Sequence, residues 1–270
     1  FQNTKEDIPG TEDNESLHPA FDQLDDMIKW KNTYYPDAFW HVNHIGSGSW
    51  DHWPAGNTYA DFIDAYVETV LKKLTGSGGK SICMDNYPLP DGGSVIKEAF
   101  LHDVLVLAHA TKNYNASLPE EQHATMGICL QTFRDVKLKL RDITSAEDVT
   151  MQMYTGMAAG ARLFEYFLYR SMDGIGLFGI VDGTGQGRIY DYVLEANERA
   201  LPFQKIVCAF DWYGMTVNHG SQSGPEDIFE VVKDLVTDET GVLTNVESRY
   251  DAIVGCFKQD NQDGYMVVNY

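Results

Sequence analysis

The sequence predicts an α/β protein in which a parallel sheet is followed by an antiparallel β-domain. Between about residues 20 and 200, stretches with apolar residues at helical spacing alternate with short runs typical of strands. Such alternation is characteristic of β/α units. After residue 201 the alternation stops, and short apolar runs separated by turn residues follow. With 270 residues, 43% of them hydrophobic, the chain can bury a sizeable core.

Four β/α units are expected in the first part of the chain. Helical spacing of apolar residues, as at Phe62, Tyr66 and Val70, predicts the helices. A capping box, Thr144-x-x-Glu147, should open the fourth of the five expected helices. The expected strands are 38–45, 81–84, 125–131 and 163–169, and the expected helices are 21–30, 59–74, 95–109, 144–159 and 189–200.

The end of the chain has the pattern of an antiparallel hairpin. A helix is expected at 227–236 and strands at 241–244, 252–257 and 264–269, with a turn at 260–264 between the last two. The chain therefore divides into three expected regions. Residues 1–205 hold the β/α units, residues 206–240 form a connection, and residues 241–270 begin the β-domain.

The charge balance excludes two classes of partner. There are 40 Asp and Glu residues against 20 Lys and Arg, and the basic residues do not gather into a patch. Nucleic acid and anionic membranes are therefore not expected to bind. No run approaches the ~18 apolar residues that a membrane span needs. An acidic balance is common in secreted enzymes, and we expect an extracellular or periplasmic location.

Neither a cofactor nor a metal is expected. The glycine-rich run at 183–187 lacks the Lys-Ser/Thr of a phosphate loop and is interpreted as a turn. His41, His44 and His52 lie close in sequence, but no H-E-x-x-H motif accompanies them, so hydrogen-bonding roles are favoured over a metal cluster. The four cysteines are widely spaced, which favours buried free thiols.

Polar and aromatic residues follow the expected strands. In β/α folds, ligands bind at the carboxyl ends of parallel strands. Aromatic side chains there offer flat apolar faces for sugar rings, and amides and carboxylates bind hydroxyl groups. The sequence therefore predicts a carbohydrate site. Its candidate binding residues are Asn43, His44, Trp50, Trp53, Asn86, Tyr87, Gln131 and Tyr169.

Two carboxylates belong to the expected strands or their ends. Asp85 follows the second strand, where it could act in catalysis, orient a substrate or cap the following loop. Glu165 lies inside the fourth strand, where it could be catalytic, pair with a residue inside a barrel or face a helix. Both are candidate catalytic residues.

Several segments, taken in order, resemble β-galactosidase-like glycoside hydrolases of the retaining (β/α)8-barrel clan, a group common in gut and environmental bacteria. Among them are Trp40-His41-Val42-Asn43, Cys83-Met84-Asp85-Asn86-Tyr87-Pro88, and residues 151–161 with Tyr166-Phe167-Leu168-Tyr169. The others are residues 18–21, residues 59–64, and Asp182-Gly183 with Tyr190 and Asn197. The resemblance covers about residues 1–205, and 250–269 is similar to the first hairpin of that group's C-terminal β-domain. It implies that the four strands are the fifth to eighth of a (β/α)8 TIM-type barrel.

The resemblance also implies a catalytic apparatus. The group's fourth strand ends in D-E-P, and the nearest match is the segment 5–9, which leaves Glu6 and Asp7 as candidate acids. Where the clan places its nucleophilic Glu, this chain has Gln131. The nucleophile then comes from elsewhere, such as Asp85 or Glu165, or the protein binds glycans without cleaving them.

The expected function is hydrolysis of O-glycosidic bonds in an oligo- or polysaccharide by paired carboxylates. The alternatives are a catalytically inactive glycan-binding or structural barrel, or a barrel enzyme of other chemistry, such as a lyase or isomerase. One carboxylate or none facing the cleft would favour the inactive barrel. The remainder of the barrel, on this chain or another, is the expected protein partner.

Overall fold

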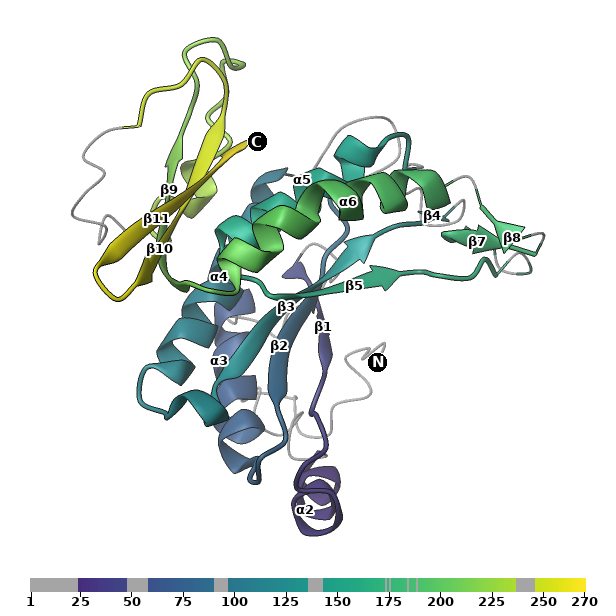
Figure 1. Ribbon diagram of the computed structural model, residues 1–270, viewed down its shortest axis with the longest axis vertical. Helices are drawn as coiled ribbons and strands as arrows, with labels where there is room; N and C mark the ends of the chain where they lie inside the picture. The colour runs from purple at the N-terminus through teal and green to yellow at the C-terminus, as the bar shows by residue number, and fades with distance from the viewer. Residues whose placement is uncertain are drawn as a thin grey trace, which may run out of the picture.

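The computed structural model describes residues 24–47, 58–89, 97–135, 143–172, 174, 176–183, 185–187, 189–236 and 246–270. These residues form an α/β architecture with a four-stranded parallel sheet and a three-stranded antiparallel sheet (Figure 1). Two further pairs of very short strands lie beyond β5, on the side away from the antiparallel sheet.

The parallel sheet is made of β1 (Asn43–Ile45), β2 (Lys80–Asp85), β3 (Ala124–Gln131) and β5 (Leu163–Phe167). They are adjacent in chain order, and every neighbouring pair is parallel. The predicted order and direction of the four strands are therefore confirmed. The first strand is shorter than expected, with an isolated bridge at Trp40 before the continuous pairing begins at Asn43. The sheet is open, and the described strands close no barrel.

Helices cover one face of this sheet. Ile82 and Met84 of β2 and Ile128 of β3 are fully buried in the core that the helices share with the strands. Residues that alternate with these point to the opposite face. The helices on this face are α3 (Tyr59–Thr69), α4 (Lys97–Asn115), α5 (Ala146–Ala158) and α6 (Tyr190–Val207). Helix α2 (Asp25–Tyr34) lies beyond the amino end of β1 (Figure 1), and short 3-10 turns are η2 (Leu71–Lys73) and η3 (Glu120–Gln122).

The capping box of α5 differs from the expected one by a residue. Ser145 is the N-cap and Asp148 occupies the third helical position. Asp148 accepts hydrogen bonds from the backbone N–H and the hydroxyl of Thr144, at 2.8 and 2.9 Å. Glu147 instead pairs with Arg199 of α6 at 2.8 Å. The predicted Thr144–Glu147 box is therefore wrong, because the helix begins one residue later.

The antiparallel sheet contains β9 (Asp211–Asn218), β10 (Ala252–Gln259) and β11 (Gln262–Asn269), in the order β11-β10-β9. The predicted hairpin of the last two strands is confirmed. Strand β9, however, lies inside the segment 206–240 that we expected to be a connection. The helix expected at 227–236 is only a 3-10 turn, η5 (Glu230–Val232). The strand expected at 241–244 lies outside the described residues.

The four short strands form two antiparallel pairs, and each pair is a ladder of two residues. β4 (Arg134–Asp135) pairs with β6 (Leu177–Phe178), and β7 (Val181–Asp182) pairs with β8 (Gly185–Gln186). The β7–β8 hairpin turns within the glycine-rich run at 183–187, as expected for a turn.

Both sheets share one hydrophobic core. The Trp212 indole of β9 donates to the Ala158 carbonyl at the end of α5, at 2.9 Å, and the Lys112 ammonium of α4 donates to the Tyr213 carbonyl at 2.8 Å. Buried side chains of both sheets, such as Met126 and Ile253, belong to a single continuous cluster. The antiparallel sheet is thus packed onto α4 and α5 and held there by specific polar contacts.

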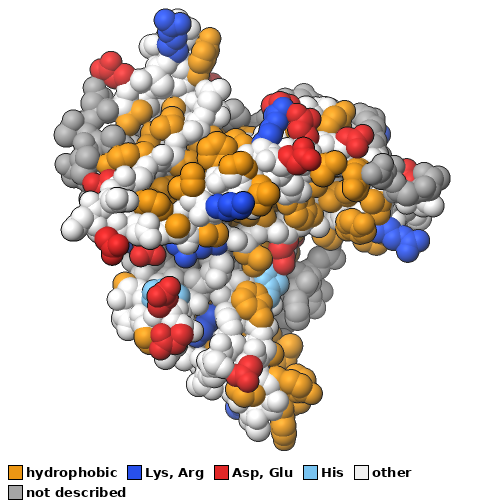
Figure 2. Space-filling model, in the orientation of Figure 1, with side chains coloured by type: hydrophobic (Ala, Val, Ile, Leu, Met, Phe, Trp, Pro, Cys, Tyr) orange, Lys and Arg blue, Asp and Glu red, His pale blue; other side chains and the backbone are white. Residues whose placement is uncertain are grey.

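An apolar groove runs between α6 and the hairpin. It is lined by side chains of both elements, among them Phe203, Ile206 and Val267, all three of which are exposed. Figure 2 shows apolar side chains gathered over this junction. No described helix has the length and apolar character needed to cross a membrane.

We predict that Gly255→Ala destabilises the fold by about 1–3 kcal/mol, the usual cost of overpacking. A Cβ at Gly255 of β10 would collide with the backbone carbonyl of Ala158, which cannot move without disturbing the end of α5. Gly264→Ala on β11 is the matched control, because its Cβ would meet Phe210 at an ordinary 3.4 Å. Urea denaturation of both variants measures the difference, and equal midpoints would contradict the predicted contact.

Candidate functional site

The candidate site is the face of the parallel sheet opposite the helices. On β2 this face carries Ser81, Cys83 and Asp85, which alternate with the buried Ile82 and Met84. The same alternation places Cys129 and Glu165 on this face. Asp85, Cys129 and Glu165 form one row across β2, β3 and β5 by direct register. Two carboxylates and two thiols therefore lie on one face.

Asp85 ends β2 and is held by its neighbours. The Asn43 amide donates to Asp85 Oδ2 at 3.1 Å, while Oδ1 is buried and has no hydrogen-bond partner among the described residues. Burial raises the pKa of Asp85 to about 6, and the charge of Glu165 adds to this, whereas hydrogen bonds from Tyr87 and Asn43 oppose it. The carboxyl group therefore gains and loses its proton near pH 6.

Aromatic rings lie beside Asp85. The Tyr87 ring meets Phe133 edge-on, with centroids 4.8 Å apart, and lies roughly parallel to Phe167 at 6.1 Å. The Tyr87 hydroxyl interacts with both Asp85 and Cys129, and burial raises its pKa well above the usual value. The sequence prediction that Asn43, Asp85 and Tyr87 come together agrees with this arrangement.

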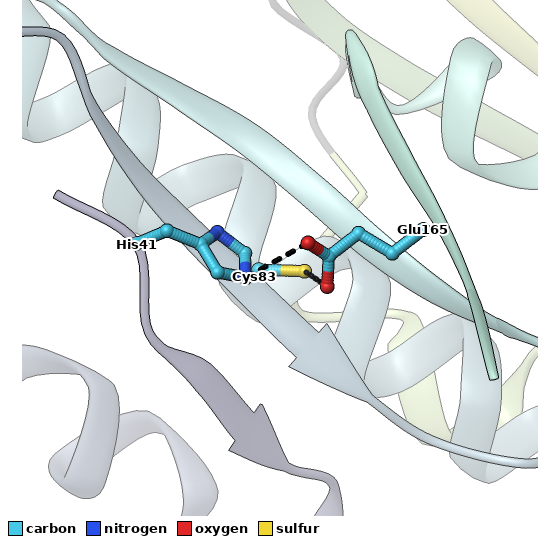
Figure 3. Close-up of side chains that lie close together, drawn as sticks. All are labelled: His41, Cys83 and Glu165. Atoms are coloured by element: carbon cyan, nitrogen blue, oxygen red, sulfur yellow. Dashed lines mark hydrogen bonds and ion pairs between the residues drawn. The ribbon is translucent and has the colours of Figure 1, made fainter. Parts of the chain in front are cut away.

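A second group on the same face joins β2 and β5 to the segment before β1. His41 Nε2 lies 3.0 Å from Glu165 Oε1 (Figure 3). His41 Nδ1 lies 2.7 Å from the Ser81 hydroxyl. Cys83 Sγ is 4.0 Å from Glu165 Oε2. Burial raises the pKa of Cys83 far above its usual value, and the nearby Glu165 charge acts in the same direction. We name these three residues, His41, Cys83 and Glu165, the triad.

A glycine makes the triad possible. Strand β3 lies between β2 and β5, so Glu165 has to cross it to reach the other two side chains. Gly127 pairs directly with Cys83 on β2 and with Leu163 on β5. A Cβ at Gly127 would lie only 3.1 Å from Cys83 Sγ. The missing side chain therefore leaves the space into which the triad converges.

Three predicted binding residues lie in the interior of the fold. His44 points to the helix face, where its ring lies 4.1 Å from that of Tyr66 and burial lowers its pKa to about 3. The Gln131 side chain accepts from the Leu89 N–H at 2.9 Å and donates to the Leu89 carbonyl at 3.1 Å. Asn86 donates to Asp103 at 2.8 Å. All three are buried, and their role in a binding site stays a prediction.

Of the remaining predicted residues, the structure describes Tyr169 but not four others. Tyr169 is 65% exposed, just beyond the end of β5. Glu6, Asp7, Trp50 and Trp53 lie outside the described residues, so the proposed acid and the tryptophan loop stay predictions.

Sequence reasoning missed Cys83, Cys129 and Asp103. The two cysteines share a face with Asp85 and Glu165. Cys83 precedes Asp85 by two residues and Cys129 precedes Gln131 by two, and residues two apart in a strand lie on the same face, so this spacing could have revealed them. Asp103 is fully buried in α4, where it accepts from the Ser47 N–H at 2.7 Å and from Asn86. A lone Asp in the apolar helix 97–115 is the corresponding signal. Through these two hydrogen bonds Asp103 fixes the chain just after β1 and just after β2.

Comparison with known proteins found no protein-family model that matches this sequence, and no curated protein that matches it. The resemblance to glycoside hydrolases therefore stays an expectation.

We predict that Asp85→Asn stabilises the protein more at about pH 7.5 than at about pH 4.5, by a difference of ~2 kcal/mol. The folded-state pKa of Asp85 is raised from 3.8 to about 6. The parent therefore loses stability as pH rises through this window, because the folded state binds the proton more tightly than the unfolded chain. Asparagine does not titrate. Urea denaturation at the two pH values measures the effect.

Glu121→Gln is the control for the loss of one negative charge, because Glu121 is exposed in η3. It should show no such pH dependence. An Asp85→Asn variant whose stability relative to the parent is the same at both pH values would contradict the burial argument.

Proposed function

We propose that this protein hydrolyses O-glycosidic bonds, with Asp85 as general acid and Glu165 as the second carboxylate. The observation that carries the proposal is the placement of both groups in one row on the open face of a parallel sheet. Burial raises the pKa of Asp85, and the charge of Glu165 adds a smaller effect in the same direction. Two carboxylates on one face favour hydrolysis over the inactive barrel, which was expected to have one or none.

The proposed fold is the second half of a (β/α)8 barrel. Four consecutive parallel strands in chain order, with helices on one face, support it. In such a barrel the face opposite the helices is the interior, and catalytic groups lie at the carboxyl ends of the strands. The remaining strands would come from further chain or from another chain.

The chemistry follows from the two environments. Asp85 keeps a proton up to about pH 6 and can give it to the leaving glycosidic oxygen, with Asn43 holding the carboxyl group. Glu165 accepts a hydrogen bond from His41, which fixes the carboxylate as it activates water or attacks the sugar. Tyr87 and Phe167 offer partly buried aromatic faces for the ring of an oligo- or polysaccharide.

We expect the chain to release the aryl group from at least one member of a panel of aryl-glycosides. Asp85→Asn and Glu165→Gln should each lower kcat by about 10²–10⁴-fold, the usual contribution of acid–base catalysis. Activity of the parent should fall as pH rises above about 6, because Asp85 then loses the proton that it must donate.

Glu121→Gln should retain full activity, and Glu6→Gln separates the two candidate acids. Loss of activity in Glu6→Gln together with full activity in Asp85→Asn would remove Asp85 from the mechanism. A parent that hydrolyses no member of a broad panel, yet binds oligosaccharides in calorimetry, would favour the glycan-binding alternative.

A further inference from the structure

We propose that the triad of His41, Cys83 and Glu165 binds one zinc ion. The inference goes beyond glycoside hydrolysis and contradicts the expectation from sequence that no metal site exists. The carrying observation is geometric. Three side chains from separate segments bring an imidazole nitrogen, a sulfur and a carboxylate oxygen within 4.8 Å of one another (Figure 3).

The spacing of the donor atoms matches a tetrahedral ion. Zinc lies about 2.0–2.1 Å from nitrogen, about 2.0–2.2 Å from oxygen and about 2.3 Å from sulfur, so neighbouring donors are ~3.3–3.6 Å apart. The His41 Nε2 to Glu165 Oε1 distance is 3.0 Å, and the Cys83 Sγ to Glu165 Oε2 distance is 4.0 Å. With one atom taken from each residue, the three donors lie within 4.8 Å of one another, so shifts of about an ångström would bring them to the zinc geometry.

The donor set selects a class of metal. Thiolate with imidazole is typical of zinc and other late transition metals, whereas calcium and magnesium prefer oxygen ligands alone. Three protein ligands leave a fourth tetrahedral position for water, which is the arrangement of catalytic rather than structural zinc. Binding would replace the Cys83 S–H bond by a zinc–sulfur bond and release that proton to solvent.

The site has an orienting partner and a route of entry. The Ser81 hydroxyl bonds His41 Nδ1 at 2.7 Å, which turns Nε2 toward Glu165, as the outer partner of a metal-bound histidine does. The side chains of His41 and Glu165 are 27% and 35% exposed, while Cys83 is fully buried beneath them. An ion could therefore reach the two outer ligands from solvent and then the sulfur.

The proposed metal and the proposed hydrolysis use Glu165 in different ways. A carboxylate bound to zinc is not free to attack a sugar or activate water, so the proposed hydrolysis belongs to the metal-free chain. Zinc binding is measured without a glycoside, so the failure of one proposal does not entail the failure of the other.

The test is titration of the purified, reduced chain with Co²⁺, which takes zinc sites and has visible and near-ultraviolet absorption. We expect one equivalent to bind, with d–d bands of a tetrahedral ion and a sulfur-to-cobalt charge-transfer band, and to be displaced by Zn²⁺. Cys83→Ser should abolish the charge-transfer band. His41→Gln and Glu165→Gln should each weaken binding by at least tenfold, and Ser81→Ala by about tenfold.

Two cysteine variants are matched controls. Cys129→Ser removes a buried thiol from the same face, and Cys208→Ser removes the exposed thiol after α6. Both should leave the spectrum and the stoichiometry unchanged. Absence of a charge-transfer band in the parent, or a band that persists in Cys83→Ser, would overturn the proposal. Ser81→Ala, which leaves all three ligands in place, tests the site independently if a ligand variant fails to fold.

Discussion

The packing of helices on one face of the parallel sheet is the constraint on which the rest of the structure depends. Successive residues of a strand point to opposite faces, so burying Ile82 and Met84 under the helices places Cys83 and Asp85 on the other side. The same rule acts on β3 and β5. Burial of the apolar residues therefore places the carboxylates and thiols together on the opposite face. Gly127, which has no side chain, lets Cys83 on β2 and Glu165 on β5 approach each other.

Buried polar side chains fix the positions of the strand ends. A backbone N–H or carbonyl without a partner is costly in the interior, and loops after parallel strands leave several such groups. Asp103 satisfies the Ser47 N–H after β1, and Gln131 satisfies both backbone groups of Leu89 after β2. Asn86 completes the arrangement by donating to Asp103. These contacts hold the segments that follow β1 and β2, next to Asp85 at the end of β2.

The crowding of acidic groups and thiols on one face has an electrostatic consequence. Burial disfavours the charged forms of Asp85, Cys83 and Cys129 alike, and each negative charge that does form raises the pKa of its neighbours. A cation or a proton on this face would relieve the repulsion. General acid catalysis by Asp85 and metal binding by the triad both draw on this same property.

The sequence by itself determined the order and type of the main elements, because hydrophobic periodicity and turn residues are local signals. It yielded four parallel strands and the final hairpin, and it singled out Asn43, Asp85 and Tyr87. It could not reveal β9, because the strand that pairs with β9 lies more than thirty residues later. It also could not show that His44 points to the helix face of the sheet and not to the opposite face. Only the tertiary structure brought His41, Cys83 and Glu165 together, because they come from segments about 40 and 80 residues apart whose side chains meet through strand register and the space left at Gly127.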